Sequence, residues 1–144
     1  MKTMKTLFAG LLCTLLMAFT ANGQELEKWS SSYASASKNL GYWVKERPAD
    51  AHYIFEWDGN HPERSQAFVT WAITHPGEAL EKFKAEHPDW TELNDLLSTY
   101  RGGMEGFRKW CMAYNDAAKA LMLHSGALKW AGDHLYQTEL NTAK

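Results

Sequence analysis

The chain has 144 residues, of which 45% are hydrophobic, and its 15 Lys and Arg against 17 Asp and Glu give a formal net charge of −2. This length suits one domain with a single hydrophobic core. The slightly acidic balance leaves no broad basic surface, so nucleic acid is excluded as an expected partner.

The first residues have the layout of a secretory signal peptide. Two lysines precede an apolar block over residues 7–19, and small residues follow it. Because this block is shorter than the about 20 apolar residues that span a membrane, we expect cleavage before Gln24 and no membrane span afterwards. The predicted division is a signal peptide, 1–23, and a single helical domain, 24–144. No Asn-x-Ser/Thr glycosylation site occurs, which favours a bacterial protein that is secreted or periplasmic.

After the leader, an apolar stripe predicts an opening helix that ends near Arg47-Pro48. Its members recur at helical spacing: Leu26, Trp29, Tyr33, Ala36 and Leu40.

Tryptophan and proline then recur through the middle of the chain with a period of 14 residues. Four tryptophans are spaced by 14, 14 and 14 residues and four prolines by 14, 14 and 12: Trp29, Trp43, Trp57 and Trp71, then Pro48, Pro62, Pro76 and Pro88. Proline fits the first position of a helix but breaks a helix interior. Each proline is therefore predicted to start a new helix, with a tryptophan near the end of the helix before it.

The helices predicted in this way span about 48–57, 62–74, 76–86 and 88–101. Isolated helices this short are marginal in water, so they must pack on one another, with tryptophan side chains in the gaps. The alternating segment 52–59 also fits a strand, but the proline positions favour a helix.

The rest of the chain predicts longer helices. The glycines of Arg101-Gly102-Gly103 are typical of a helix end, and a long helix follows to about His124. A break over residues 124–127 precedes a last apolar stripe that begins at Leu128. The prediction is an all-α protein: a compact bundle of about six or seven helices, with short proline-initiated helices in the middle of the chain.

Regular spacing predicts that most tryptophans lie in the core. Trp130 is the strongest candidate for an exposed binding residue, because the apolar residues around it define a different stripe of the same helix. Tyr136 is a second candidate for binding. Arg101, beside the glycine amides, is a third and would suit an anion.

Two histidines, His61 and His87, precede proline at predicted helix starts, and antiparallel packing would bring both to one end of the bundle. They are a weak candidate metal site, since two His without a third ligand do not specify a metal. No cofactor-binding motif occurs, so no cofactor is predicted.

Glu56 and Asp58 are weak candidates for an acid–base pair in glycan hydrolysis, which needs two carboxyl groups at a set separation. The alternative is that both are solvated carboxylates near a helix end. Cys111 is the only cysteine left after the leader, and helical spacing places it on a buried stripe with Phe107. We expect a buried thiol rather than a nucleophile.

These observations lead to three functional hypotheses. The preferred one is an exported, non-enzymatic helical domain that binds another macromolecule, as an inhibitor, an immunity protein or an envelope accessory protein. Export, abundant aromatic residues and the lack of a catalytic motif favour it. The alternatives are a small hydrolase of cell-wall or glycan substrates and a carrier of a metal or small ligand. The expected partner is a protein or glycan of the cell envelope.

Overall fold

The computed structural model describes the backbone of residues 23–124 and 126–142 and the side chains of residues 23–124 and 126–135. All regular structure in this part of the chain is helical, so the predicted all-α class is confirmed and the strand alternative for 52–59 is wrong. No described helix has the length and apolarity of a membrane span. The signal peptide predicted for 1–23 lies almost entirely outside the described residues, so it stays a prediction.

In the described part of the chain, eight helices follow a helical segment at residues 23–32. They are α2 (Ala34–Glu46), α3 (Pro48–Asn60), α4 (Pro62–Thr74), α5 (Leu80–Glu86), α6 (Thr91–Thr99), α7 (Arg101–Ala113), α8 (Asn115–Leu121) and α9 (Ala127–Thr142). The predicted six or seven helices are too few. Two segments whose apolar stripes predicted one helix each contain two helices instead. The helix is interrupted at Tyr33 in the first segment and at Tyr114 in the second.

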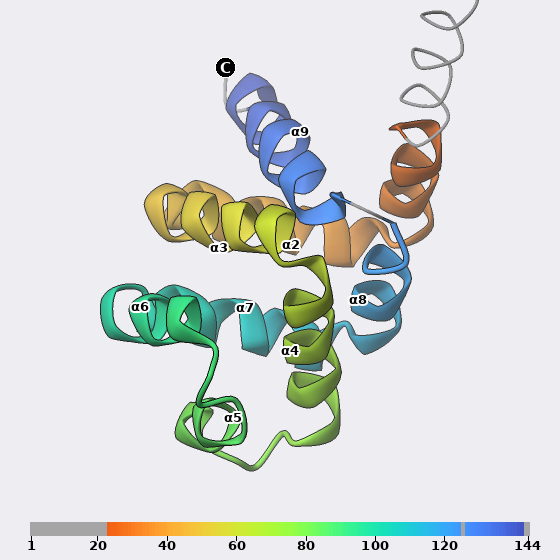
Figure 1. Ribbon diagram of the computed structural model, residues 1–144. Coiled ribbons are helices and arrows are strands. Elements are labelled where there is room, and N and C mark those ends of the chain that lie inside the picture. Colours follow the sequence, from red (N-terminus) through yellow and green to blue (C-terminus); the bar gives the residue numbers. More distant parts are fainter. Residues whose placement is uncertain (1–22, 125, 143–144) are drawn as a thin grey trace, which may run out of the picture.

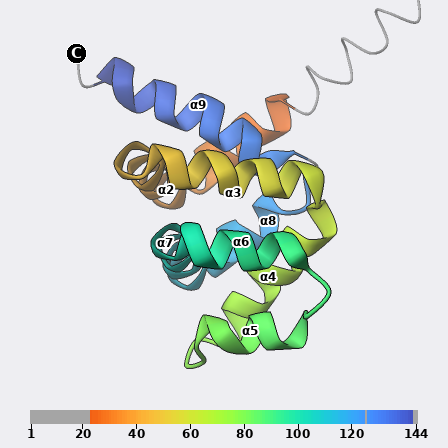
Figure 2. The same ribbon diagram turned by 60° about the vertical axis from the view of Figure 1, so that its left-hand side comes forward.

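The helices stack in layers, as Figure 1 and Figure 2 show. α9 lies across α2 and α3, α6 and α7 form the next layer, and α5 lies on the far side. α4 runs along one side of this stack, where it contacts α3, α7 and α8. α7 contacts α2, α3, α4, α6 and α8, and α3 contacts α2, α4, α6, α7 and α9, so these two helices lie at the centre of the described fold.

A single residue separates consecutive helices at five junctions of the described chain: Tyr33, Arg47, His61, Tyr100 and Tyr114. Each has φ between −137° and −118° and donates its backbone N–H to the carbonyl oxygen four residues earlier, at 2.7–3.0 Å. That carbonyl belongs to a tryptophan at four of the five junctions. The 14-residue period is thus a 13-residue helix plus one non-helical residue. At the three junctions formed by tyrosine, the next helix starts without a proline.

Only the first two prolines start helices, namely α3 and α4. Contrary to the prediction, Pro76 and Pro88 lie in turns, four and three residues ahead of α5 and α6. Arg108 of α7 explains the first exception. Its buried Nη2 donates to the carbonyl oxygens of His75 (3.1 Å), Pro76 (3.4 Å) and Glu78. These bonds fasten the turn over residues 75–78 to α7, in place of the helix expected from Pro76.

The sequence analysis predicted a helix end at the glycines after Arg101, and this is wrong. Both glycines lie in the first turn of α7. They allow α7 to approach α2 and α3 closely. A Cβ on Gly103 would lie 2.5 Å from Cβ of Asp50, and a Cβ on Gly106 would lie 2.5 Å from Nε1 of Trp43. The glycines are therefore packing residues, which a pattern of helix-end residues does not reveal.

The core prediction for the tryptophans is confirmed at five positions, each 4–9% exposed: Trp29, Trp43, Trp57, Trp71 and Trp110. Two of them bond across helices: Nε1 of Trp29 donates to the Ala117 carbonyl oxygen and Nε1 of Trp110 to that of Ala36, each at 2.8 Å. Cys111 is also buried, and burial raises the pKa of its thiol well above the usual range.

Candidate functional site

The exposed side of α3 lies between two grooves, one shared with α9 and one with α6. Figure 2 shows α3 between these two helices. The exposed residues recur at helical spacing and form what we call the α3 face: His52, Tyr53, Glu56 and Asn60. The opposite side of α3 is anchored in the core by Ile54 and Phe55.

The groove shared with α9, the α9 groove, has a volume of about 860 Å³. Its floor is apolar and includes three buried side chains: Val44, Ala51 and Phe55. Its rims are charged or titratable: His52, Glu56, Lys129 and Asp133. Gly132 brings α9 close to α3, because a Cβ there would lie 2.5 Å from the Phe55 ring.

The groove shared with α6, the α6 groove, is smaller, at about 260 Å³. Aromatic rings and polar side chains line it: Tyr53, Trp57, Tyr100, Glu56, Asn60, His61, Glu92, Asp95 and Thr99. Glu56 and Asn60 line both grooves. The α3 face is therefore one continuous surface from α9 to α6.

Two tyrosines form the aromatic wall of the α6 groove. The rings of Tyr53 and Tyr100 stack with their centroids 4.6 Å apart and an interplanar angle of 23°. Tyr53 is 45% exposed. Desolvation raises the pKa of the Tyr100 hydroxyl, and its hydrogen bond with Tyr53 raises that pKa further. The Tyr100 hydroxyl is therefore protonated at neutral pH and remains a hydrogen-bond donor.

Glu92, near the start of α6, also lines the groove and is held by Arg64. Desolvation alone would raise the pKa of the Glu92 carboxyl, but the hydrogen bond and charge of Arg64 outweigh it and lower the pKa. The Arg64 guanidinium also lies 5.1 Å from the ring centroid of Trp90. Nε1 of Trp57 is buried without an acceptor in hydrogen-bonding geometry among the described residues, although it lies close enough to Glu92 to help lower that pKa.

No family model, curated protein or solved structure matches this chain. The function of the α3 face is therefore inferred from its own groups. These are ring surfaces for stacking, carboxylate and amide oxygens as acceptors, and an apolar floor.

Glu56 and Asp58, the predicted acid–base candidates, face different sides of α3. Glu56 is exposed, and its Oε2 lies 3.4 Å from Nε2 of His52. Asp58 is only 4% exposed and accepts hydrogen bonds from Ser65 Oγ and from the backbone N–H of Leu128 at the start of α9. Burial raises the pKa of the Asp58 carboxyl despite these bonds. Glu56 thus lies in both grooves, whereas Asp58 joins α3 to α9 beneath the surface.

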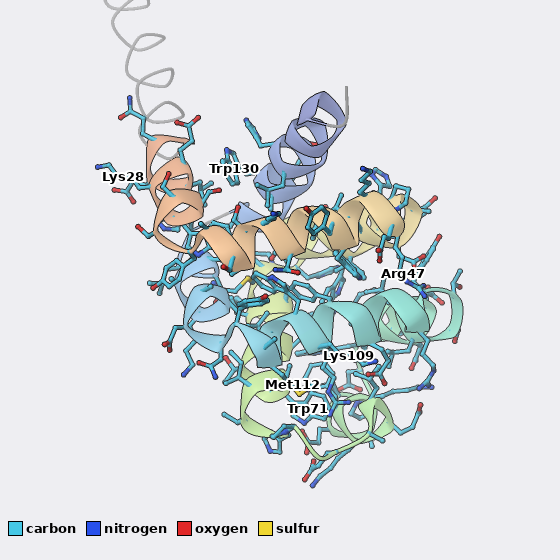
Figure 3. The ribbon with its side chains drawn as sticks, turned by 180° about the vertical axis from the view of Figure 1, so that it is seen from behind. Lys28, Arg47, Trp71, Lys109, Met112 and Trp130 are labelled. Carbon is cyan, nitrogen blue, oxygen red and sulfur yellow. The ribbon has the colours of Figure 1, made fainter. Side chains whose placement is uncertain are left out.

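Two of the predicted binding residues, Trp130 and Arg101, do not lie on the α3 face. Trp130 is partly buried and stacks on His134, with centroids 4.7 Å apart. Figure 3 shows Trp130 between α9 and the helical residues 23–32. Arg101 pairs with Glu81 of α5, so its guanidinium is not directed at the glycine amides of α7. The side chain of Tyr136 lies outside the described residues.

The two candidate metal ligands are held in different surroundings. His61 lines the α6 groove, whereas the ring of His87 stacks on Trp90 with centroids 3.8 Å apart. In the part of the chain that the structure describes, no group of three or more His, Cys, Asp or Glu is placed to hold a metal ion.

Tyr53 and Tyr100 are two of the site residues that the sequence analysis did not single out, as are His52, Asn60, Glu92 and Asp95. Tyr53 lies in the segment 52–59, which was considered only as a helix or a strand. A signal was available, because His52, Glu56 and Asn60 recur every four residues and place Tyr53 beside a polar stripe. Tyr100 had no comparable signal, since its place depends on how α6 packs on α3.

Proposed function

We propose that this protein is an exported, non-enzymatic helical domain that binds another macromolecule through the α3 face. It would act as an inhibitor, an immunity protein or an envelope accessory protein. The observation that carries the proposal is the continuity of the surface, since Glu56 and Asn60 line both grooves. The leader-like residues 1–23 support export to the periplasm or the exterior of a bacterium. The partner is a protein or a glycan of the cell envelope.

The composition of the α3 face supports macromolecular recognition. Protein interfaces combine an apolar centre with a polar rim, and the α9 groove has this arrangement. Exposed aromatic side chains are frequent anchors of such interfaces, and the exposed Tyr53 lies on the α6 side of the α3 face. The face thus offers an anchor, an apolar recess and charged groups that orient a partner.

The electrostatics of the carboxylates favour recognition over hydrolysis. A general acid in glycan hydrolysis needs a raised pKa and access to the substrate. Asp58 has a raised pKa but is only 4% exposed, and Arg64 lowers the pKa of Glu92. Glu56 lies within ion-pair distance of His52. The Glu92 carboxylate is suited to act as a charged hydrogen-bond acceptor for a bound partner.

Photo-crosslinking tests this function. A photoreactive phenylalanine analogue replaces Tyr53 in one variant and Tyr42, the exposed tyrosine of α2, in a control variant. Both proteins are exposed to an envelope fraction of the producing organism, and the crosslinked molecules are identified. We expect a specific adduct from position 53 and none from position 42, because only Tyr53 lies on the α3 face.

The identified molecule is then purified and its dissociation constant is measured. We expect Tyr53→Ala to weaken binding about tenfold or more, as for loss of an interface anchor, and Tyr42→Ala to leave it unchanged. Equal dissociation constants for Tyr53→Ala and Tyr42→Ala would show that the partner does not bind at the α3 face. Turnover of the captured molecule by the wild-type protein would establish the hydrolase alternative instead.

A further inference from the structure

The α6 groove combines exposed aromatic surface with hydrogen-bonding groups of both kinds. Tyr53 is 45% exposed and presents the part of its ring that neither the stacked Tyr100 nor the neighbouring His52 ring covers. Asn60 offers a donor and an acceptor, and the carboxylates of Glu92 and Asp95 offer acceptors only. A ligand that matches this lining has a flat apolar face and several groups that both donate and accept hydrogen bonds.

A pyranose sugar has both properties. Its C–H groups form an apolar face that packs on an aromatic ring, and its hydroxyl groups donate to carboxylates and accept from amides. A cationic side chain would also be attracted to tyrosine rings and carboxylates, but it only donates hydrogen bonds.

Asn60 distinguishes between these two ligands. Its side-chain amide lines the groove and offers N–H donors as well as an acceptor oxygen. A sugar hydroxyl can accept from this amide and donate to the Asp95 carboxylate, whereas an ammonium or guanidinium group has no acceptor for the amide.

The dimensions of the groove set the size of the ligand. Its volume of about 260 Å³ is slightly below the range of about 300–1,000 Å³ that is usual for small-molecule sites. It therefore suits a single sugar ring. Glu56 and Asn60 continue the surface into the α9 groove, so neighbouring units of a longer glycan have room to cross the α3 face.

We propose that the α6 groove binds one pyranose unit of a glycan, which stacks on Tyr53 and hydrogen-bonds to Asn60 and Asp95. The inference rests on the proposed function, because it names the class of partner that the α3 face recognises. One ring in an open groove makes few contacts, so the dissociation constant is expected to be on the order of 1 mM.

A titration followed by NMR tests the inference. The isotope-labelled protein is titrated with N,N′-diacetylchitobiose, cellobiose and maltose, which separate amino-sugar ligands from glucose ligands. At least one of them is expected to give saturable shifts in the residues that line the α6 groove. Tyr53→Ala should weaken binding about tenfold, since it removes the stacking surface, while Tyr53→Phe should retain binding. Asp95→Asn should weaken binding, and the matched control Tyr42→Ala should leave it unchanged.

Three results would overturn the inference. The first is a lack of saturable shifts at the α6 groove with every saccharide, and the second is unchanged saccharide binding by Tyr53→Ala. The third is that a trilysine peptide shifts the groove residues while the saccharides do not, which would assign the groove to a cationic partner. In each case a specific crosslink from position 53 to an envelope protein would leave the proposed function standing, so the two failures are distinguishable.

Discussion

Asp58 illustrates how a single buried polar residue joins distant parts of this chain. It is one of four polar or charged residues buried among the described side chains, together with Ser37, Ser65 and Arg108. Its carboxylate accepts hydrogen bonds from Ser65 of α4 and from the Leu128 amide in the first turn of α9. The first amides of a helix lack partners within the helix, so a carboxylate at that position stabilises the start of α9.

The pKa of Asp58 predicts a pH dependence of stability. Burial is the largest cause of its shift and raises the pKa in the folded protein. A raised folded pKa means that the folded state binds the proton more tightly than the unfolded chain does. Its contribution to stability is complete below the unfolded pKa of about 3.9 and is lost as pH rises through the folded pKa.

Asp58→Asn keeps an acceptor oxygen but does not titrate, so it isolates this effect. The free energy of unfolding is measured for the wild type and the variant by urea denaturation from about pH 3 to about pH 8. We expect the wild type to lose stability relative to the variant as pH rises. A gain of wild-type stability relative to Asp58→Asn over the same range would show that the hydrogen bonds, not burial, dominate the pKa.

At the scale of helices, α7 shows how small residues set the distance between elements. Glycine costs about 1 kcal/mol relative to alanine in a helix interior, so its presence in α7 needs a compensating gain. Gly103 and Gly106 provide that gain, because they allow Asp50 and Trp43 to lie directly against the α7 backbone. The close contact of α7 with α2 and α3 depends on these two positions.

Gly106→Ala is predicted to destabilise the protein despite the better helix propensity of alanine. The new Cβ would lie 2.5 Å from Nε1 of Trp43, a buried ring that has little room to move. We expect a loss of about 1–2 kcal/mol in the free energy of unfolding, measured by urea denaturation. Gly59→Ala in α3 is the matched control, since no atom lies within 4 Å of its added Cβ. Stability changes of equal sign in the two variants would contradict a packing role for Gly106.

At the scale of the whole molecule, the buried side chains form one cluster that runs from Leu26 in the first helical segment to Leu135 in α9. No described helix has a core of its own, and five tryptophans are distributed through the shared one. Short helices of this kind are marginal by themselves, so they depend on each other for stability.

A shared core predicts that the helices unfold together. Tryptophan fluorescence reports on core packing, and far-UV circular dichroism reports on helix content. The two signals should give the same urea midpoint and the same slope, as a two-state transition requires. A fluorescence transition at clearly lower urea than the loss of helix would show that part of the core opens independently.

Part of the site was within reach of the sequence. The polar stripe of α3 can be recognised from the four-residue spacing of its members, and Glu56 was identified as a site candidate. Trp130 and Arg101 were chosen for local reasons, but neither lines an α3 groove, because contacts with His134 and Glu81 determine their positions. The α6 groove depends on residues about 40 positions apart, and no local pattern links Tyr53 to Asp95 and Tyr100.

The sequence by itself determined the helical class, the 14-residue period and the burial of the regularly spaced tryptophans, because helical spacing and proline geometry are local properties of the backbone. Only the tertiary structure decided where several of the helices begin and end. Arg108 holds the carbonyls after α4 in a turn, and contacts with α2 and α3 turn an expected helix end into the start of α7. These contacts join residues about 30 to 60 positions apart, so no sequence pattern within one helix contains them.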